Sequence, residues 1–188
     1  MRARKRVYTR FMAEPTFWLD LDDHCYLNNA LNFVAGVNCF ELGLLNSQAM
    51  WFVLCDSALT MRGGFVQVHD HVLERFPIPT VTADVRAGVA EWASSAQTAA
   101  QARHREMKRF GRTVLRDFAP GGAKLRAAWD HVIPEFTELC DEVGKRFKRE
   151  LRLAELDAAV ARCEQWIDAE VYRLFDLSPA EVALIESA

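Results

Sequence analysis

The proline-bounded segment Phe76-Pro77-Ile78-Pro79 divides this 188-residue sequence into two parts of different character. Before it, short runs of β-branched and aromatic residues alternate with glycine, proline and asparagine, a pattern typical of strands and turns. After it, residues 82–109 are rich in alanine, glutamine and arginine, which favour helices. The sequence therefore predicts a predominantly helical α+β protein, with a small strand-and-helix region over 1–80 and an all-helical region over 81–188.

Short strands are expected first in the N-terminal region, over residues 7–12, 16–21 and 31–37. Residues 39–59 follow with apolar side chains at helical spacing, and Asn46-Ser47 interrupts them. We expect Asn46 and Ser47 to have structural roles, as a helix end and as the N-cap of a second helix.

A glycine pair, Gly63-Gly64, predicts a tight turn after these helices, because glycine tolerates positive φ where other residues do not. The five residues after the pair alternate between outward and inward positions like a strand. This alternation places Phe65, Gln67 and His69 on one face.

In the C-terminal region the sequence predicts helices with breaks at Gly111 and at Pro120-Gly121-Gly122. A further helical stretch is expected over 123–150. The next helix, over 151–175, carries an apolar stripe suited to helix–helix packing, formed by Leu153, Leu156, Val160, Cys163, Ile167, Val171 and Leu174. Ser178-Pro179-Ala180-Glu181 is a capping box with proline at the first helical position.

The net charge of −3 is not by itself the signature of a DNA-binding protein. Basic residues dominate over 1–10 and over 101–152, whereas acidic residues dominate over 153–188. Such a distribution is compatible with one face for phosphate groups, and equally with ordinary solvated helix faces.

Five scattered cysteines, an odd number, favour reduced thiols in a cytoplasmic protein over a disulfide framework. No apolar run approaches the roughly 20 residues of a membrane helix, so a membrane is not among the expected partners. His69-Asp70-His71 and His24-Cys25 lack the second ligand pair of a zinc site, so we expect no metal. No residue is assigned a catalytic role.

Three phrases occur in a fixed order in the first half of the chain: Leu42-Gly43-Leu44-Leu45-Asn46-Ser47, Met61-Arg62-Gly63-Gly64 and Glu74-Arg75-Phe76-Pro77-Ile78-Pro79. Together they resemble the C-terminal target-recognition region, the TaqI-like specificity domain, of type II and type IIG restriction-modification adenine-specific DNA methyltransferases. The closing segment 168–181 is similar to that family's last helix and capped tail.

This resemblance implies a module that reads double-stranded DNA, while a methyltransferase catalytic domain, in cis or in trans, transfers a methyl group from S-adenosylmethionine to adenine N6. The chain has no Asn-Pro-Pro-Tyr motif for the flipped adenine and no glycine-rich cofactor loop after a strand. We therefore expect no cofactor and no catalysis in this chain alone.

The turn and strand after Met61 are the expected base-reading segment. Arginine grips guanine O6 and N7 in a fork, and glutamine pairs with adenine. Three basic residues on the following helix would hold the phosphate backbone without reading sequence. The candidate DNA-binding residues are Arg62, Gly63, Gly64, Gln67, His69, Arg105, Lys108 and Arg109.

Two other classes of function fit the same sequence. The stripe from Leu153 to Leu174 would suit a helical protein-interaction module, packing on a partner protein or across a homodimer. The chain would also fit a remnant of a truncated methyltransferase gene. Binding to DNA separates the target-recognition reading from both alternatives.

Overall fold

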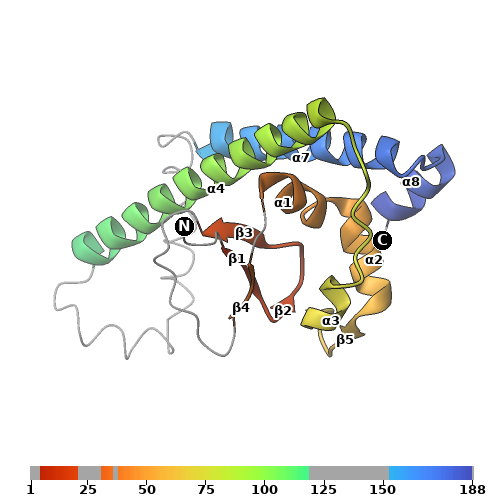
Figure 1. Ribbon diagram of the computed structural model, residues 1–188. Coiled ribbons are helices and arrows are strands. Elements are labelled where there is room, and N and C mark those ends of the chain that lie inside the picture. Colours follow the sequence, from red (N-terminus) through yellow and green to blue (C-terminus); the bar gives the residue numbers. More distant parts are fainter. Residues whose placement is uncertain (1–4, 21–30, 36–37, 119–152, 188) are drawn as a thin grey trace. The chain divides into compact units, whose positions relative to one another are not determined.

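The computed structural model of the protein describes residues 5–20, 31–35, 38–118 and 153–187 (Figure 1). Two compact units form: Met1–Gln97 together with Arg162–Ala188, and Thr98–Ala161. The predicted stretch over 123–150, with its break at Pro120-Gly121-Gly122, lies outside the described residues. Strands occur only before residue 68 in the described part, and long helices follow, which confirms the α+β, predominantly helical class.

Among the described residues of the first unit, six short strands form two antiparallel sheets. The first sheet has the order β3-β1-β4 and the second the order β2-β6-β5. The strand expected over 7–12 is in fact two strands, because the chain bends at Arg10 and its two halves join different sheets. The strands are β1 (Lys5–Thr9), β2 (Phe11–Met12), β3 (Phe17–Asp20), β4 (Leu31–Ala35), β5 (Leu59–Thr60) and β6 (Val66–Gln67).

Two consecutive helices, α1 (Cys39–Leu45) and α2 (Gln48–Ser57), lie against the strands. Asn38 begins α1 through a capping box with Glu41. The Ser47 hydroxyl accepts from the N–H of Met50 and so caps α2, which confirms the predicted N-cap. A short helix, α3 (Asp70–Leu73), follows the second sheet.

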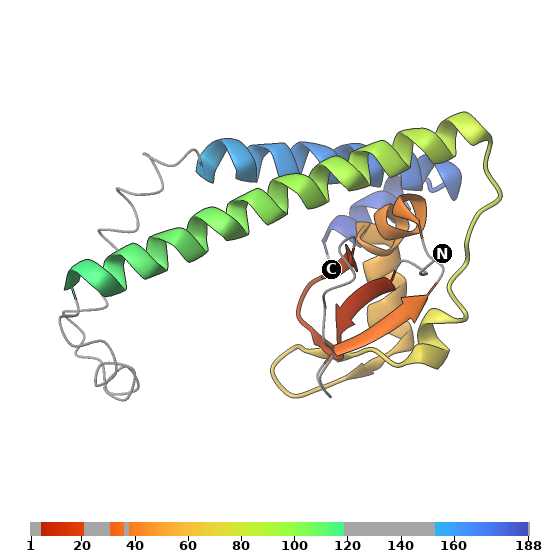
Figure 2. The same ribbon diagram turned by 60° about the vertical axis from the view of Figure 1, so that its left-hand side comes forward.

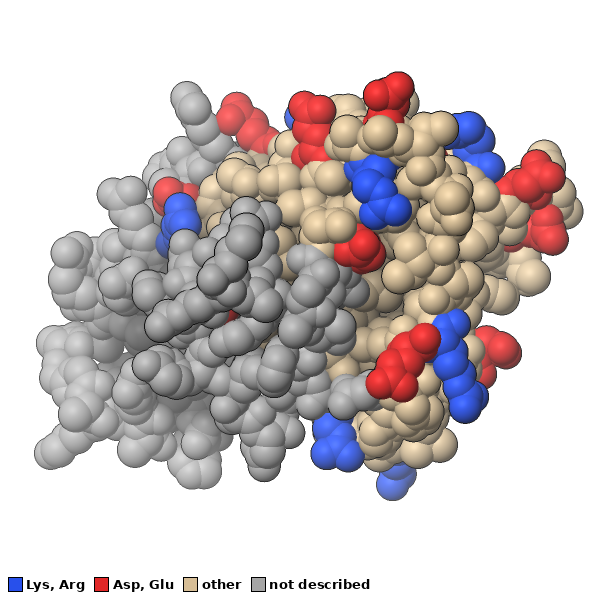
Figure 3. Space-filling view, in the orientation of Figure 1, with Lys and Arg blue, Asp and Glu red and all other residues tan. Residues whose placement is uncertain are grey.

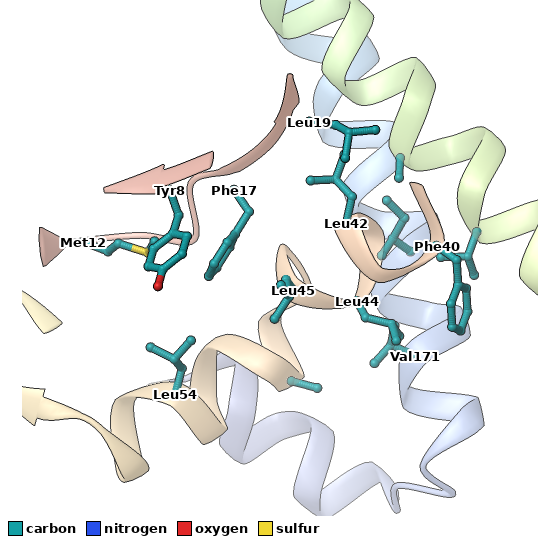
Figure 4. Packing of buried hydrophobic residues seen from close by; sticks show 14 of the residues in the cluster. Tyr8, Met12, Phe17, Leu19, Phe40, Leu42, Leu44, Leu45, Leu54 and Val171 are labelled. Carbon is teal, nitrogen blue, oxygen red and sulfur yellow. The ribbon is translucent and has the colours of Figure 1, made fainter. Parts of the chain in front are cut away.

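The core of the first unit is formed by the strands, by α1 and α2, and by Val89, Ala93, Ile167 and Val171 from two later helices (Figure 4). Tyr8, Met12 and Phe17 from the strands meet Leu45 and Leu54 from α1 and α2 in this view. The rings of Tyr8 and Phe17 are 5.4 Å apart at a tilt of 39°. Burial of these apolar side chains is the main stabilising contribution to the unit.

Two long helices each begin in one unit and end in the other: α4 (Ala83–Phe118) and α7 (Leu153–Leu174). Figures 1 and 2 agree in placing the first turns of α4 beside the last turns of α7, where Trp92 stacks on Trp166. The break predicted at Gly111 is wrong, since α4 continues to Phe118. A single glycine costs a helix about 1 kcal/mol relative to alanine, and its helix-forming neighbours offset this.

The predicted stripe of α7 is buried over part of its length. Leu153, Cys163, Ile167 and Val171 are buried, whereas Leu156, Val160 and Leu174 are half-buried. The capping box at Ser178 is confirmed: it begins α8 (Pro179–Glu186), with the Glu181 carboxylate accepting from the N–H of Ser178 at 2.7 Å.

Candidate nucleic-acid interface

The predicted glycine turn forms the tip of a hairpin between β5 and β6. The N–H of Met61 donates to the carbonyl of Phe65 at 2.6 Å, and the N–H of Gly64 donates to the carbonyl of Met61 at 3.3 Å. Gly63 and Gly64 have φ values of 91° and 80°, which confirms that both positions need glycine. Arg62, beside them, is exposed.

The strand after the turn alternates in burial as predicted. Val66 and Val68 are buried in the core, so Phe65, Gln67 and His69 lie on the opposite, outer side. Only Val66 and Gln67 belong to the sheet ladder, which is shorter than the predicted strand. The inner valines anchor the hairpin, and the outer residues face away from the core.

The outer face of the second sheet is rich in apolar side chains. The register pairs Phe11 with Gln67 and Gln67 with Leu59, so these three residues share that face. Phe11, Leu59 and Phe65 are 45 %, 61 % and 46 % exposed. Exposed aromatic rings beside polar groups are suited to contacts with bases or with another protein surface.

A hydrogen-bonded network joins Gln67 to its neighbours on this face. With its amide oriented to satisfy them, Gln67 Oε1 accepts from Arg10 Nη2 at 3.1 Å, from Arg10 Nε at 3.2 Å and from His69 Nε2 at 3.1 Å. The ring of His69 stacks on that of His71, with centroids 5.5 Å apart. The sequence did not single out Arg10, because its partner is more than fifty residues away along the chain.

The predicted phosphate-binding residues Arg105, Lys108 and Arg109 lie in the part of α4 that belongs to the second unit. The helix is continuous here, so the three positions fall on one side of its backbone. Arg105 is exposed, and nearby Arg103 forms an ion pair with Asp157 of α7. The structure thus gathers Arg62, Gly63, Gly64, Gln67 and His69 in one unit and leaves the basic helix positions in the other.

Acidic and basic side chains are interspersed over the visible face of the described residues (Figure 3). A protein that grips DNA mainly through phosphates shows a broad basic surface instead. We therefore expect any DNA contact in the first unit to depend on the hairpin and its neighbours.

The phrase that ends in Asn46-Ser47 has a structural role, as expected. Asn46 hydrogen-bonds to the backbone of β3, and Ser47 caps α2 and donates to the carbonyl of Leu44 at 2.7 Å. Ser47 is buried, so it is not part of an exposed ligand surface.

One half-buried carboxylate away from the hairpin, Asp168, has a raised pKa. Asp168 of α7 accepts from the N–H of Gln48, the first residue of α2, at 2.8 Å. Burial raises the pKa of Asp168 to about 6, against the lowering effect of this N–H, and the charges of Glu164 and Glu186 raise it further. Burial, together with the negative charges of Asp168 and Glu186, likewise raises the pKa of Tyr172 to about 12. Asp168 thus connects α7 to the start of α2, which is a structural contact.

Within the described residues, no group of three or more His, Cys, Asp or Glu side chains is arranged to hold a metal ion. No helix of the described part combines the length and apolar character that a membrane crossing requires. Cys39, Cys55 and Cys163 are free thiols, and burial raises the pKa of Cys55 and of Cys163.

Comparison of the chain with protein-family models, with curated proteins and with solved structures finds no match. The resemblance to target-recognition regions therefore stays a prediction from the sequence phrases alone.

Proposed function

We propose that this chain is a DNA target-recognition module of a type II restriction-modification N6-adenine methyltransferase, acting with a catalytic domain supplied in cis or in trans. The observation that carries the proposal is the hairpin from Leu59 to His69. Its inner side is fixed in the core by Val66 and Val68. Its outer side presents Arg62, Gln67 and His69, the kinds of side chain that hydrogen-bond to base edges.

Packing of the inner side of the strand in the core matters for recognition of bases. A contact that must distinguish one base from another needs its side chains held close to the productive geometry before binding. Val66 and Val68 provide that support in the strand, and the two glycines allow the backbone of the turn to come close to a phosphate or a base. The mixed charge of the visible face predicts modest affinity for the chain alone.

The glycine turn of the described residues does not match a loop that would hold S-adenosylmethionine. Such a loop, in dinucleotide-like folds, joins a strand to a helix, with the glycines at the helix start. Gly63 and Gly64 instead connect two antiparallel strands. We assign the cofactor to the catalytic domain.

The test is a binding assay with the full chain, measuring the fluorescence anisotropy of labelled duplexes selected from a random pool. Arg62→Ala or Gln67→Ala should cost roughly 1–3 kcal/mol and relax the preference at one base pair. Lys108→Ala should weaken all duplexes alike and flatten the salt dependence. Arg75→Ala, an exposed arginine outside the hairpin, is the matched control and should change little.

The proposal fails if selection yields no preferred duplex, alone or with a methyltransferase catalytic domain added. It also fails if a preferred duplex is found and both hairpin substitutions leave its affinity and base preference unchanged. A chain that folds but ignores DNA would be an interaction module or a remnant.

A second candidate function, a helical interaction module, has one observation of its own. Trp92 of α4 and Trp166 of α7 stack with centroids 5.7 Å apart and planes at 6°, yet they are 39 % and 59 % exposed. Large exposed aromatic side chains are frequent at protein interfaces. Sedimentation of the chain with and without Trp166→Ala tests whether this pair holds two copies together.

A further inference from the structure

The amide of Gln67 is held in one orientation by cationic and ring N–H groups. Arg10 supplies two of the three donors to Oε1 and His69 supplies the third. The Arg10 backbone is itself fixed beside this strand, because its carbonyl accepts from the N–H of Val68 at 3.0 Å. Its guanidinium also lies 5.9 Å from the centroid of the Phe11 ring. The network is therefore anchored on both sides of Gln67.

Arginine has five N–H donors and no acceptor, so it can hold only the oxygen of the amide. Turning the Gln67 amide over would place its NH2 group against the N–H groups of Arg10, which is repulsive and leaves both sets of donors unpaired. An amide oxygen has two lone pairs, and three donors already share them. Any contact between Gln67 and a base must then go through the NH2 group.

This orientation changes which base Gln67 suits. Pairing with adenine needs the amide oxygen to accept from the adenine N6 amino group while the NH2 group donates to N7. That oxygen is occupied, so the adenine pairing expected from sequence is blocked in this arrangement. Guanine presents two acceptors side by side, O6 and N7, which an NH2 group with two hydrogens matches.

We propose that Arg10 is a positioning residue that fixes Gln67 as a donor, so that the base contacted by Gln67 is guanine rather than adenine. The inference rests on the proposed function and names the base class that the hairpin reads. Arg10 acts through Gln67 and need not touch the DNA.

The experiment measures base preference with the full chain, using the duplex selected from a random pool and its single-base variants. Gln67→Glu keeps two oxygens for Arg10 but removes the NH2 group, so the preference for guanine at one position should fall on the order of 10-fold. In the unsubstituted chain, 7-deazaguanine at that position should weaken binding, since it lacks the N7 acceptor.

Arg10→Met is the decisive variant, because methionine keeps an apolar stem and supplies no N–H donor. The freed amide can turn, so adenine should gain on guanine at the same position, on the order of 10-fold. A purely structural role of Arg10 would weaken all duplexes equally and leave this preference unmoved. Circular dichroism checks that each variant folds. If Arg10→Met does not fold, the Gln67→Glu and 7-deazaguanine results decide.

The outcomes separate the two proposals. If no duplex is preferred, the proposed function fails and this inference with it. If a duplex is preferred but the Gln67-dependent position is adenine, or its preference survives both substitutions, only the assignment of Arg10 and Gln67 is overturned.

Discussion

The side-chain amide of Asn46 bridges both backbone polar groups of Phe17. Asn46 Oδ1 accepts from the N–H of Phe17 at 3.0 Å, and Asn46 Nδ2 donates to its carbonyl at 2.9 Å. Gln97 of α4 bridges the backbone of Leu19, two residues further along β3, in the same way. Its Oε1 accepts from the N–H of Leu19 at 2.7 Å, and its Nε2 donates to the carbonyl of Leu19 at 3.0 Å. Because β3 is an edge strand, these two amides replace the missing neighbouring strand.

We expect Asn46→Ala and Gln97→Ala each to lower the free energy of unfolding by roughly 1–3 kcal/mol, since each leaves an N–H and a carbonyl of β3 unpaired. Asn46→Asp, which keeps the acceptor and loses the donor, serves as a partial control and should fall between wild type and Asn46→Ala. Urea denaturation measures all three. A change below about 0.5 kcal/mol for both alanine variants would show that water replaces the amides at no cost.

Substitution by alanine should change stability in opposite directions at two helical glycines, Gly43 of α1 and Gly88 of α4. A Cβ on Gly43 of α1 would lie 2.8 Å from Val89 Cγ1 and 3.3 Å from the Cβ of Ala93, so Gly43→Ala should destabilise by about 1–3 kcal/mol. A Cβ on Gly88 of α4 meets nothing within 4 Å. Gly88→Ala should therefore raise stability by up to about 1 kcal/mol, because alanine is the better helix former.

Thermal unfolding of the Gly43 and Gly88 variants, side by side, checks this contrast. Equal shifts in Tm for the two would mean that helix propensity alone, and not the close approach of α1 to α4, sets the outcome.

Asp168 should make stability depend on pH. Its pKa is raised in the folded protein from 3.8 to about 6, so the folded state binds the proton more tightly than the unfolded state. The contribution of this proton to the free energy of unfolding is fully present below about pH 4, and it is lost as the pH rises through about 6. Asp168→Asn keeps an oxygen for the N–H of Gln48 and cannot ionise.

We therefore expect the unfolding free energy of Asp168→Asn, relative to wild type, to increase as pH rises from about 4.5 to about 7.5. Urea denaturation of both proteins at several pH values measures this difference. Other titrating groups are the same in both proteins, so their contributions to the difference largely cancel. A difference that stays constant across the range would contradict the raised pKa.

The stripe of α7 should be sensitive only where it is buried. Ile167 is buried, so Ile167→Ala should cost about 2–5 kcal/mol. Gln165 is exposed on the same helix, and Gln165→Ala should change stability by less than about 0.5 kcal/mol. Chemical denaturation of the two variants provides the comparison, and a small loss at Ile167 would show that this part of α7 does not pack as described.

The chain alone should not methylate DNA. Its sequence has no Asn-Pro-Pro-Tyr motif, and in the described residues no glycine-rich loop joins a strand to a helix. Incubation of the pure protein with duplex DNA and radiolabelled S-adenosylmethionine should leave adenine unlabelled. Labelling at an enzymatic rate would show that the chain carries a catalytic site of its own.

Local chemistry in the sequence by itself determined several parts of this protein. The Ser47 and Ser178 caps, the glycine turn and the placement of Phe65, Gln67 and His69 on one face were all predictable. Each depends on residues within a few positions of one another, where backbone geometry and side-chain periodicity leave few choices.

Only the tertiary structure decided which distant groups meet. The bend at Arg10 that sends β1 and β2 into different sheets, the pairing of Gln97 with Leu19 and the hold of Arg10 on Gln67 join residues far apart along the chain. Helix α4 also continues through Gly111, where sequence predicted a break. Such contacts depend on where packing of the whole core places each strand and helix, and a local pattern does not contain that information.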